Sequence, residues 1–336
     1  MFMTGQPIIT ERKRIVHICR ASLLAAALTV VSSSALADGE SMLDCPLRDA
    51  PYSIDTPLVD VLLSSTAKGV LEEAMPGVLG RLPPHMAGTE APTFGAIMSL
   101  RTMSGMMGLP AEKLNELDRK LAEVDVTDAD RQARCARYDN EVPVFDPAEA
   151  EARVLVFHKI NGFDHGPSVD AATRAIEALA EQLGWSVVVT DKAGAFNEEM
   201  LSHFDTVVWN NVSGDVLTLS QRQAFEDYIS QGGGFLGIHG SGGDFIYFWE
   251  WYADELLGAR FIGHPADPQF QDAHLHIEET SSRIGEAVAP GWTMKDEWYS
   301  FRNNPRESGA MVIATLDEST YVAEGYGGQD LRMGQD

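Results

Sequence analysis

Short apolar runs alternate with longer amphipathic stretches between positions 153 and 238, and this alternation restricts the fold more than any other feature. Residues 154–157, 185–189 and 206–209 are nearly continuous apolar runs, as strands buried on both faces of a parallel sheet are. Strands that alternate with helices are joined by right-handed crossovers into βαβ units. The sequence therefore predicts the α/β class, with a doubly wound, mostly parallel sheet that is flavodoxin-like in outline.

The glycine-rich stretch 232–241 supplies the fourth expected strand and ends in a histidine beside glycine. In an open parallel sheet, ligands bind just beyond the carboxyl ends of the strands. Gly237-Ile238-His239-Gly240-Ser241 has the outline of a nucleophile elbow, with His239 at the position that Ser or Cys usually holds. An ordinary histidine on a glycine-rich turn fits the same residues, so the pattern alone leaves both interpretations open.

Polar side chains follow three of the expected strands, and more come later in the chain. They include His165, Asp215, His239, Asp244, His264 and Asp296-Glu297-Trp298-Tyr299. Neutral imidazole and carboxylate are ligands for zinc, and they serve equally well in acid–base catalysis near neutral pH. The spacing does not separate these uses, because the sequence has no H-x-x-x-H or C-x-x-C motif. Cysteine is absent beyond residue 150, which excludes a Cys-His-Glu amide hydrolase.

The first 37 residues have the features of a secretory signal peptide. Arg12-Lys13-Arg14 precedes an apolar run at 21–31 that is too short to span a bilayer. Ala35-Leu36-Ala37 then fits an A-x-A cleavage site before Asp38. We therefore expect export to the periplasm or the extracellular space, with no integral membrane segment after cleavage.

Residues 38–150 carry helical patterns and end in a proline-containing linker at 140–149. One of the expected helices contains Phe94, Ile97, Met98 and Arg101. We expect a small helical region at 38–150, followed by the α/β domain at 151–336. The formal net charge of −25 opposes binding to nucleic acid and to anionic membranes.

Two cysteines, Cys45 and Cys135, remain once the signal peptide is removed. In an oxidising compartment they predict one disulfide, which would close a loop of about ninety residues. Two buried free thiols are the alternative.

The chain resembles the ThuA-like (trehalose-utilisation) family from about residue 153 to the end. The resemblance rests on several segments that occur in the same order: Val154-Leu155-Val156-Phe157, Gly162-Phe163-Asp164-His165, Gly232-Gly233-Gly234-Phe235-Leu236-Gly237-Ile238-His239, His264-Pro265, Asp296-Glu297-Trp298-Tyr299, Asn304-Pro305-Arg306, and Thr315-Leu316-Asp317-Glu318-Ser319-Thr320-Tyr321.

This resemblance implies a class I glutamine-amidotransferase-like fold, with histidine at the usual cysteine position. It also implies a link to disaccharide or keto-sugar metabolism. The matching polar positions are His165, His239, His264 and Glu297, which we take as candidate catalytic residues. Members of the family continue beyond the equivalent of Met333-Gly334-Gln335-Asp336, so we expect this sequence to be truncated at its carboxyl end.

We therefore predict an exported enzyme that acts on a glycoside or keto-sugar, and whose partner is a small-molecule sugar. His165, His239 and His264 are the expected ligands if a divalent metal ion such as zinc takes part. Asp215, Asp244 and Arg302 would orient sugar hydroxyls, and Trp298 or Tyr299 would offer a stacking face. The alternative is a non-catalytic carbohydrate-binding protein on the same scaffold.

Overall fold

The computed structural model describes residues 42–105, 108–146, 149–278 and 291–334. The predicted signal peptide and its cleavage site lie outside these residues. So do Met106 and Met107, and the segments 147–148, 279–290 and 335–336. In the described part of the chain, no helix combines the length and the apolar character needed to cross a bilayer.

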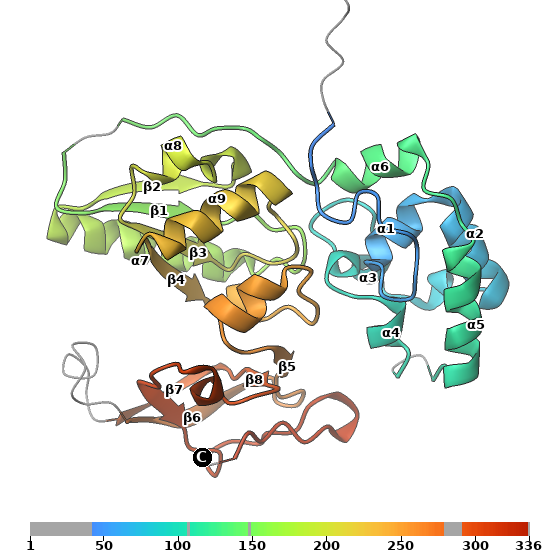
Figure 1. The fold of residues 1–336 in the computed structure, drawn as a ribbon. Helices are drawn as coiled ribbons and strands as arrows, with labels where there is room; N and C mark the ends of the chain where they lie inside the picture. The colour runs from blue at the N-terminus through green and yellow to red at the C-terminus, as the bar shows by residue number, and fades with distance from the viewer. Residues whose placement is uncertain (1–41, 106–107, 147–148, 279–290, 335–336) are drawn as a thin grey trace, which may run out of the picture. The chain divides into compact units, whose positions relative to one another are not determined.

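A four-stranded parallel sheet forms the centre of the α/β domain (Figure 1). Its strands are β1 (Arg153–Phe157), β2 (Ser186–Thr190), β3 (Thr206–Asn210) and β4 (Gly234–Ile238), in the order β2-β1-β3-β4. This order matches the first four strands of a flavodoxin-like sheet. The prediction of a parallel α/β fold is therefore confirmed.

Helices cover both faces of this sheet, because successive strand residues point to opposite sides. On one face, Val154, Val156 and Val208 pack against Ile176 of α7 (Gly166–Leu183). On the other face, Leu155, Phe157 and Trp209 pack against α8 (Glu198–Leu201) and α9 (Leu219–Ser230). Figure 1 shows α7 on one side of the sheet and α8 and α9 on the other. The sheet is thus doubly wound, as expected.

The helix ends follow local sequence signals. Thr218 and Gln221 form a reciprocal capping box at the start of α9, as the pattern predicts. Gly184 ends α7 in the left-handed conformation, which glycine adopts without a steric penalty.

The region before the sheet is helical and has its own apolar core. It contains α1 (Leu58–Leu63), α2 (Ser65–Ala74), α3 (Pro84–Ala87), α4 (Leu100–Met103), α5 (Ala111–Ala122) and α6 (Asp128–Cys135). Its core includes Leu58, Leu71, Ile97, Leu100 and Leu117, all buried.

The prediction that one helix contains both Phe94 and Arg101 is wrong. The chain forms a short 3₁₀ turn at Phe94–Ala96 and then starts α4, because Ser99 caps the new helix in a capping box with Thr102.

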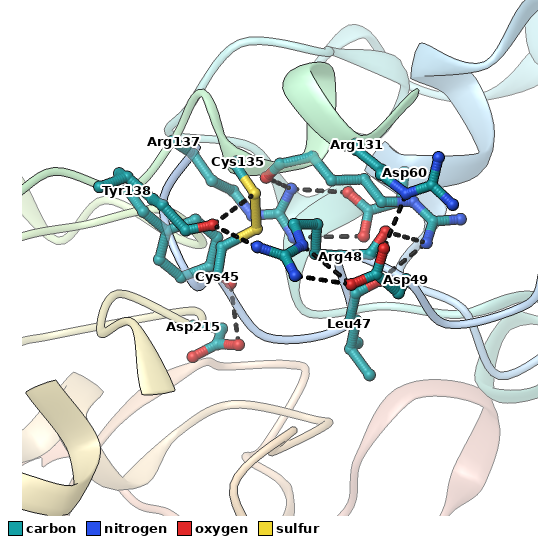
Figure 2. The surroundings of a disulfide bond; sticks show 12 residues. Cys45, Leu47, Arg48, Asp49, Asp60, Arg131, Cys135, Arg137, Tyr138 and Asp215 are labelled. Atoms are coloured by element: carbon teal, nitrogen blue, oxygen red, sulfur yellow. Dashed lines mark hydrogen bonds and ion pairs between the residues drawn. A yellow bond between two sulfur atoms is a disulfide. The ribbon is translucent and has the colours of Figure 1, made fainter. Parts of the chain in front are cut away.

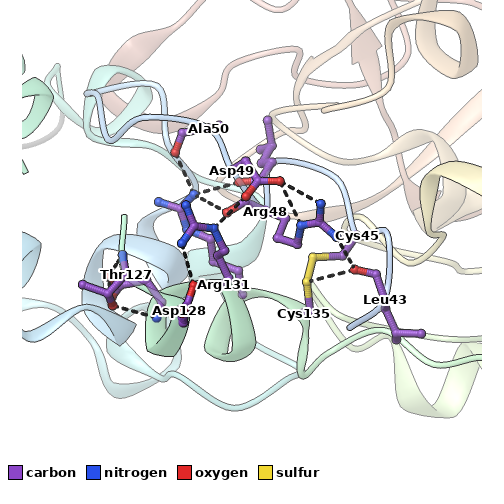
Figure 3. Close-up of polar contacts among 12 residues, drawn as sticks. Leu43, Cys45, Arg48, Asp49, Ala50, Thr127, Asp128, Arg131 and Cys135 are labelled. Carbon is purple, nitrogen blue, oxygen red and sulfur yellow. Dashed lines mark hydrogen bonds and ion pairs between the residues drawn. A yellow bond between two sulfur atoms is a disulfide. The ribbon is translucent and has the colours of Figure 1, made fainter. Parts of the chain in front are cut away.

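Cys45 and Cys135 form a disulfide, as expected, with their Cα atoms 5.5 Å apart (Figure 2). Around it, Arg131 of α6 pairs with Asp49 at 2.7 Å and with Asp128 at 2.9 Å (Figure 3). The buried Arg134 donates to the carbonyl of Leu47 at 2.7 Å. The disulfide and these polar contacts hold residues 45–50 against α6.

Hydrogen bonds connect the helical region with the α/β domain at several points. The Tyr138 hydroxyl donates to Asp215 at 2.9 Å (Figure 2). The backbone of Leu219, at the start of α9, donates to the carbonyl of Asp44 at 3.0 Å, and Thr93 donates to Asn161 at 3.0 Å.

After β4 the chain forms a π-helix (Trp251–Leu256) and two small antiparallel sheets. One pairs β5 (Phe261–Gly263) with β8 (Ser300–Phe301). The other has the order β7-β6-β9, from β6 (Phe270–Ile277), β7 (Gly291–Glu297) and β9 (Ala314–Leu316). The strand expected at 274–277 lies within β6. The strand expected at 312–315 overlaps β9, which begins and ends later in the sequence.

Candidate functional site

His239 sits on a strained turn directly after β4. Its φ of +40° places it in the left-handed region, where residues with a side chain are uncommon. Asn211, after β3, has a φ of +57°, and its side-chain oxygen accepts a hydrogen bond from the backbone of Gly240 at 3.2 Å. The turn thus has the strained backbone expected of an elbow, and such outliers cluster at functional sites.

Glu297, the last residue of β7, is the centre of a group of histidines. His239 donates from Nε2 to Glu297 Oε2 at 3.1 Å, and Nε2 of His264 lies 3.5 Å from Oε1. Gln269 also donates to Oε1. We call the four side chains His165, His239, His264 and Glu297 the His–Glu cluster.

The pKa of Glu297 shows how strongly its partners favour the carboxylate. Burial alone would raise it, but the hydrogen bonds from His239 and Gln269 and the charge of His264 outweigh burial and lower the pKa to about 2. Glu297 is therefore an anion throughout the ordinary pH range.

His165 enters the cluster from the start of α7. Its ring meets that of His239 edge to face, with the centroids 4.9 Å apart, and its Nε2 lies 3.2 Å from the Tyr299 hydroxyl. Burial, and then the nearby His239, lower the pKa of His165 to about 4. His165 is therefore a neutral imidazole at neutral pH, which is the form that ligates metals.

Tyr299 closes the cluster on the side of β8. Its ring stacks on His239 with the centroids 4.3 Å apart. Burial, followed by the charge of Glu297, raises the pKa of Tyr299 far above its ordinary value. The hydroxyl thus stays protonated and can donate a hydrogen bond.

His165, His239 and Glu297 can each direct one ligand atom toward a shared point, with all three atoms within 4.8 Å of one another. Within the described ranges this is the one place where three His, Cys, Asp or Glu side chains come so close. His264 lies outside this group of three. However, its Nδ1 donates to the carbonyl of Pro265 at 3.0 Å, which leaves Nε2 directed toward Glu297.

A cavity of about 760 Å³ lies beside the cluster, within the size range of small-molecule sites. His165, His264, Glu297, Tyr299 and Gln269 line one part of it, and the helical region contributes Phe94, Ile97, Met98 and Met86. The cavity therefore adjoins both the cluster and the helical region.

Asp244 also lines this cavity, but its carboxylate is already engaged. It accepts hydrogen bonds from the Ser213 hydroxyl and the Gly214 backbone, each at 2.6 Å. Burial raises its pKa to about 7 against the opposing effect of these two bonds. The contacts hold the loop after β3 against the turn after β4.

Three other predicted substrate-binding residues lie apart from the cluster. Asp215 is buried in an ion pair with Arg222 and also accepts the Tyr138 hydroxyl. Trp298, between β7 and β8, is buried away from the cavity that Glu297 and Tyr299 line, and its indole nitrogen donates to the carbonyl of Gln271 at 2.8 Å. Arg302 is exposed after β8, and it does not line the 760 Å³ cavity.

Sequence reasoning missed two parts of the site. Gln269 is a single glutamine in an irregular segment, and no motif marks it. The apolar wall from Phe94 to Met98 looked like ordinary helix core, because apolar residues at helical spacing usually are.

Comparison of the sequence and the fold with known proteins identifies a family. The family model described as ThuA, trehalose utilisation, matches residues 153–335. A comparison with curated proteins finds no match. A ThuA-like protein of known structure from Bacteroides uniformis is 19% identical, with 54% of this chain and 74% of that chain covered and a TM-score of 0.47. Another from Parabacteroides merdae is 12% identical, covers 49% of this chain and 75% of that chain, and has a TM-score of 0.33.

Proposed function

Since the chain belongs to the ThuA family over residues 153–335, we propose that it is a carbohydrate-active enzyme whose chemical centre is the His–Glu cluster. Its substrate is a glycoside or keto-sugar, and a divalent metal ion, with zinc as the first choice, takes part. One observation carries this proposal. His165, His239 and Glu297 bring three ligand atoms within 4.8 Å of one another beside a cavity of small-molecule size.

The distances in the cluster fit such an ion. Zinc bonds of about 2.0–2.1 Å place two tetrahedral ligand atoms about 3.3 Å apart. The distance from His239 Nε2 to Glu297 Oε2 is 3.1 Å, and that from His264 Nε2 to Glu297 Oε1 is 3.5 Å. His264 donates its other ring nitrogen to a backbone carbonyl, as metal-bound histidines commonly do. We therefore assign His165, His239 and Glu297 as ligands, with His264 as a fourth.

The protonation states of these side chains support the same assignment. Glu297 is ionised and His165 is neutral near pH 7, and metal ligands must be deprotonated. When bound, the ion supplies a Lewis acid that polarises a sugar oxygen. Tyr299, whose hydroxyl stays protonated, donates a hydrogen bond to the substrate.

Export from the cytoplasm is part of this proposal. The first 37 residues have the composition of a signal peptide, and the disulfide between Cys45 and Cys135 suits an oxidising compartment. We propose that the protein works in the periplasm or outside the cell.

The first test is the metal content of the protein, purified without a histidine tag. We expect about one divalent ion per chain in the wild type and a loss of most of it in His239→Ala and in Glu297→Gln. His276→Ala is the matched control, because the exposed His276 and the half-buried His274 lie side by side on β6, with ring centroids 4.6 Å apart, and could hold an ion adventitiously. Loss of the ion in the control but not in His239→Ala would place the ion on β6 and overturn the assignment.

Turnover is the second measurement. The metal-loaded protein is incubated with glucosides and with keto-glucosides, and product is followed by mass spectrometry. Product formed by the wild type and lost in His239→Ala supports an enzyme. Sugar binding without turnover would instead favour a non-catalytic carbohydrate-binding protein.

A further inference from the structure

Both polar and apolar side chains line the cavity beside the His–Glu cluster, and we call the part at Glu297 its polar end and the part at Phe94 its apolar end. His165, His264, Glu297 and Gln269 line the polar end. Phe94, Ile97, Met98 and Phe163 line the apolar end, and the first three of these belong to the helical region rather than to the α/β domain. The volume of about 760 Å³ lies in the upper half of the range for small-molecule sites, so the cavity has room for more than one ring.

The apolar end exposes aromatic surface next to the cluster. The Phe163 side chain is 42% exposed, and its ring meets His165 at 4.7 Å and Phe94 at 5.2 Å, edge to face in both cases. Phe245, also in the cavity wall, is 39% exposed. Large exposed apolar side chains that gather in a hollow mark a binding surface rather than random surface composition.

The position of Phe94 is fixed relative to the α/β domain by short contacts. Thr93, the preceding residue, donates to Asn161 at 3.0 Å, and its side chain caps the turn that Phe94 begins. A side chain at Gly162 would meet Ile97, so the two segments approach at van der Waals distance. The helical region therefore supplies a fixed wall to the cavity.

From this arrangement we infer that the helical region sets substrate specificity, and that the preferred substrate is a glycoside with an aromatic aglycone. The inference rests on the proposed carbohydrate function. The sugar ring lies at the polar end, and the aglycone lies against Phe94 and Phe163. The helical region adds two polar side chains to the cavity, His85 and Thr102, beside four apolar ones. A second sugar ring against Phe94 and Phe163 would therefore leave most of its hydroxyls without hydrogen bonds. An aromatic ring instead buries apolar area and makes favourable ring contacts there.

The test is a calorimetric titration with phenyl glucoside, methyl glucoside and trehalose, using both anomers of the first two. We expect phenyl glucoside to bind at least about tenfold more tightly than methyl glucoside, and more tightly than trehalose. This preference falls to about threefold or less in Phe94→Ala and in Phe163→Ala, while the affinity for methyl glucoside stays within about twofold.

Phe145→Ala is the matched control. Phe145 is also a half-buried phenylalanine in aromatic contact, with His203 and Phe204, but it does not line the cavity. It should keep the full preference for the phenyl ring. Phe163→Leu, which retains an apolar side chain, covers the case in which Phe94→Ala fails to fold, and it should show an intermediate preference.

The outcomes separate this inference from the function on which it rests. If methyl glucoside binds and the phenyl ring gives no advantage, or the advantage survives in both alanine variants, the inference is overturned and the carbohydrate function stands. If the wild type binds none of these glucosides, the inference is overturned, and the carbohydrate function is decided by the turnover measurement with keto-glucosides.

Discussion

Gly240 is the residue on which the position of His165 depends most directly. A Cβ at Gly240 would lie 2.7 Å from His165 Nδ1 and 2.8 Å from its Cε1, which is too close for either atom. The ring of His165 can approach His239 only because residue 240 has no side chain.

We therefore expect Gly240→Ala to displace His165 and to weaken metal binding by at least about tenfold. Overpacking of this kind also lowers the free energy of unfolding by about 1–3 kcal/mol. Gly242→Ala, in the same turn, is the control, because a Cβ there has no atom within 4 Å. Metal titration and chemical unfolding of both variants test this. Equal metal affinity in the two variants would contradict the account.

The low pKa of His165 predicts that stability depends on pH. Burial, with a contribution from His239, lowers the pKa to about 4 in the folded protein, against about 6.5 in an unfolded chain. Between these values the unfolded chain takes up a proton that the folded protein does not. The free energy of unfolding should therefore fall as the pH drops from about 6.5 to 4, by at most about 3 kcal/mol.

The measurement compares urea unfolding of the wild type and His165→Gln across that pH range, in metal-free buffer. The difference between the two proteins isolates His165 from Asp244, whose raised pKa acts in the opposite direction as the pH changes. Parallel pH profiles would show that His165 titrates normally in the folded protein.

At the scale of single elements, a carboxylate in the loop between β3 and α9 forms a buried ion pair. Asp215 pairs with Arg222 of α9, and both side chains are more than nine-tenths buried. Removing one partner of such a pair leaves the other as an uncompensated buried charge.

We expect Asp215→Asn to lower the free energy of unfolding by about 3 kcal/mol and to leave sugar affinity unchanged. Asp254→Asn breaks the more exposed pair with Arg260 and should cost no more than about 1 kcal/mol. Unfolding curves and sugar titrations of both variants show whether Asp215 stabilises the fold or binds the sugar. A loss of sugar affinity at normal stability would instead support the predicted substrate-binding role of Asp215.

The elements themselves were largely predictable. Nearly continuous apolar runs mark β1 and β3 because both faces of these strands are buried. His165 and His239 could be placed together because the carboxyl ends of parallel strands share one edge of the sheet. Of the two predicted stacking residues, Tyr299 lines the cavity and Trp298 does not. This difference could have been predicted, since neighbours in an extended segment point to opposite sides and Glu297 faces the cluster.

Other parts of the site depend on contacts that a sequence pattern does not encode. Asp215 looks like a loop carboxylate available to a ligand, and only the fold brings Arg222 and Tyr138 to it. Phe94 has the spacing of a core residue, and its place in the cavity wall follows from the contact between Thr93 and Asn161. Long-range contacts of this kind become visible only in three dimensions.

At the scale of the whole molecule, the disulfide joins segments that contact both the helical region and the α/β domain. Cys45 is bonded to Cys135 of α6, and its neighbour Asp44 accepts hydrogen bonds from the backbone of Leu219 and Ser220 at the start of α9. The carboxylate of Asp44 thus lies at the positive end of that helix dipole. Reduction should therefore loosen the contact of residues 44–45 with the α/β domain as well as the helical region.

We expect reduction to lower the free energy of unfolding by at most about 4–5 kcal/mol, the chain-entropy value for a loop of this length. Tryptophan fluorescence is the informative probe, because all six tryptophans lie beyond residue 150 and report on the α/β domain alone. Its unfolding midpoint should fall on addition of dithiothreitol, together with the midpoint followed by circular dichroism. A Cys45→Ser, Cys135→Ser double variant should have the unfolding midpoints of the reduced protein, and dithiothreitol should not change them. If the fluorescence midpoint stays fixed while the dichroism midpoint falls, the disulfide stabilises the helical region only, and the two regions unfold independently.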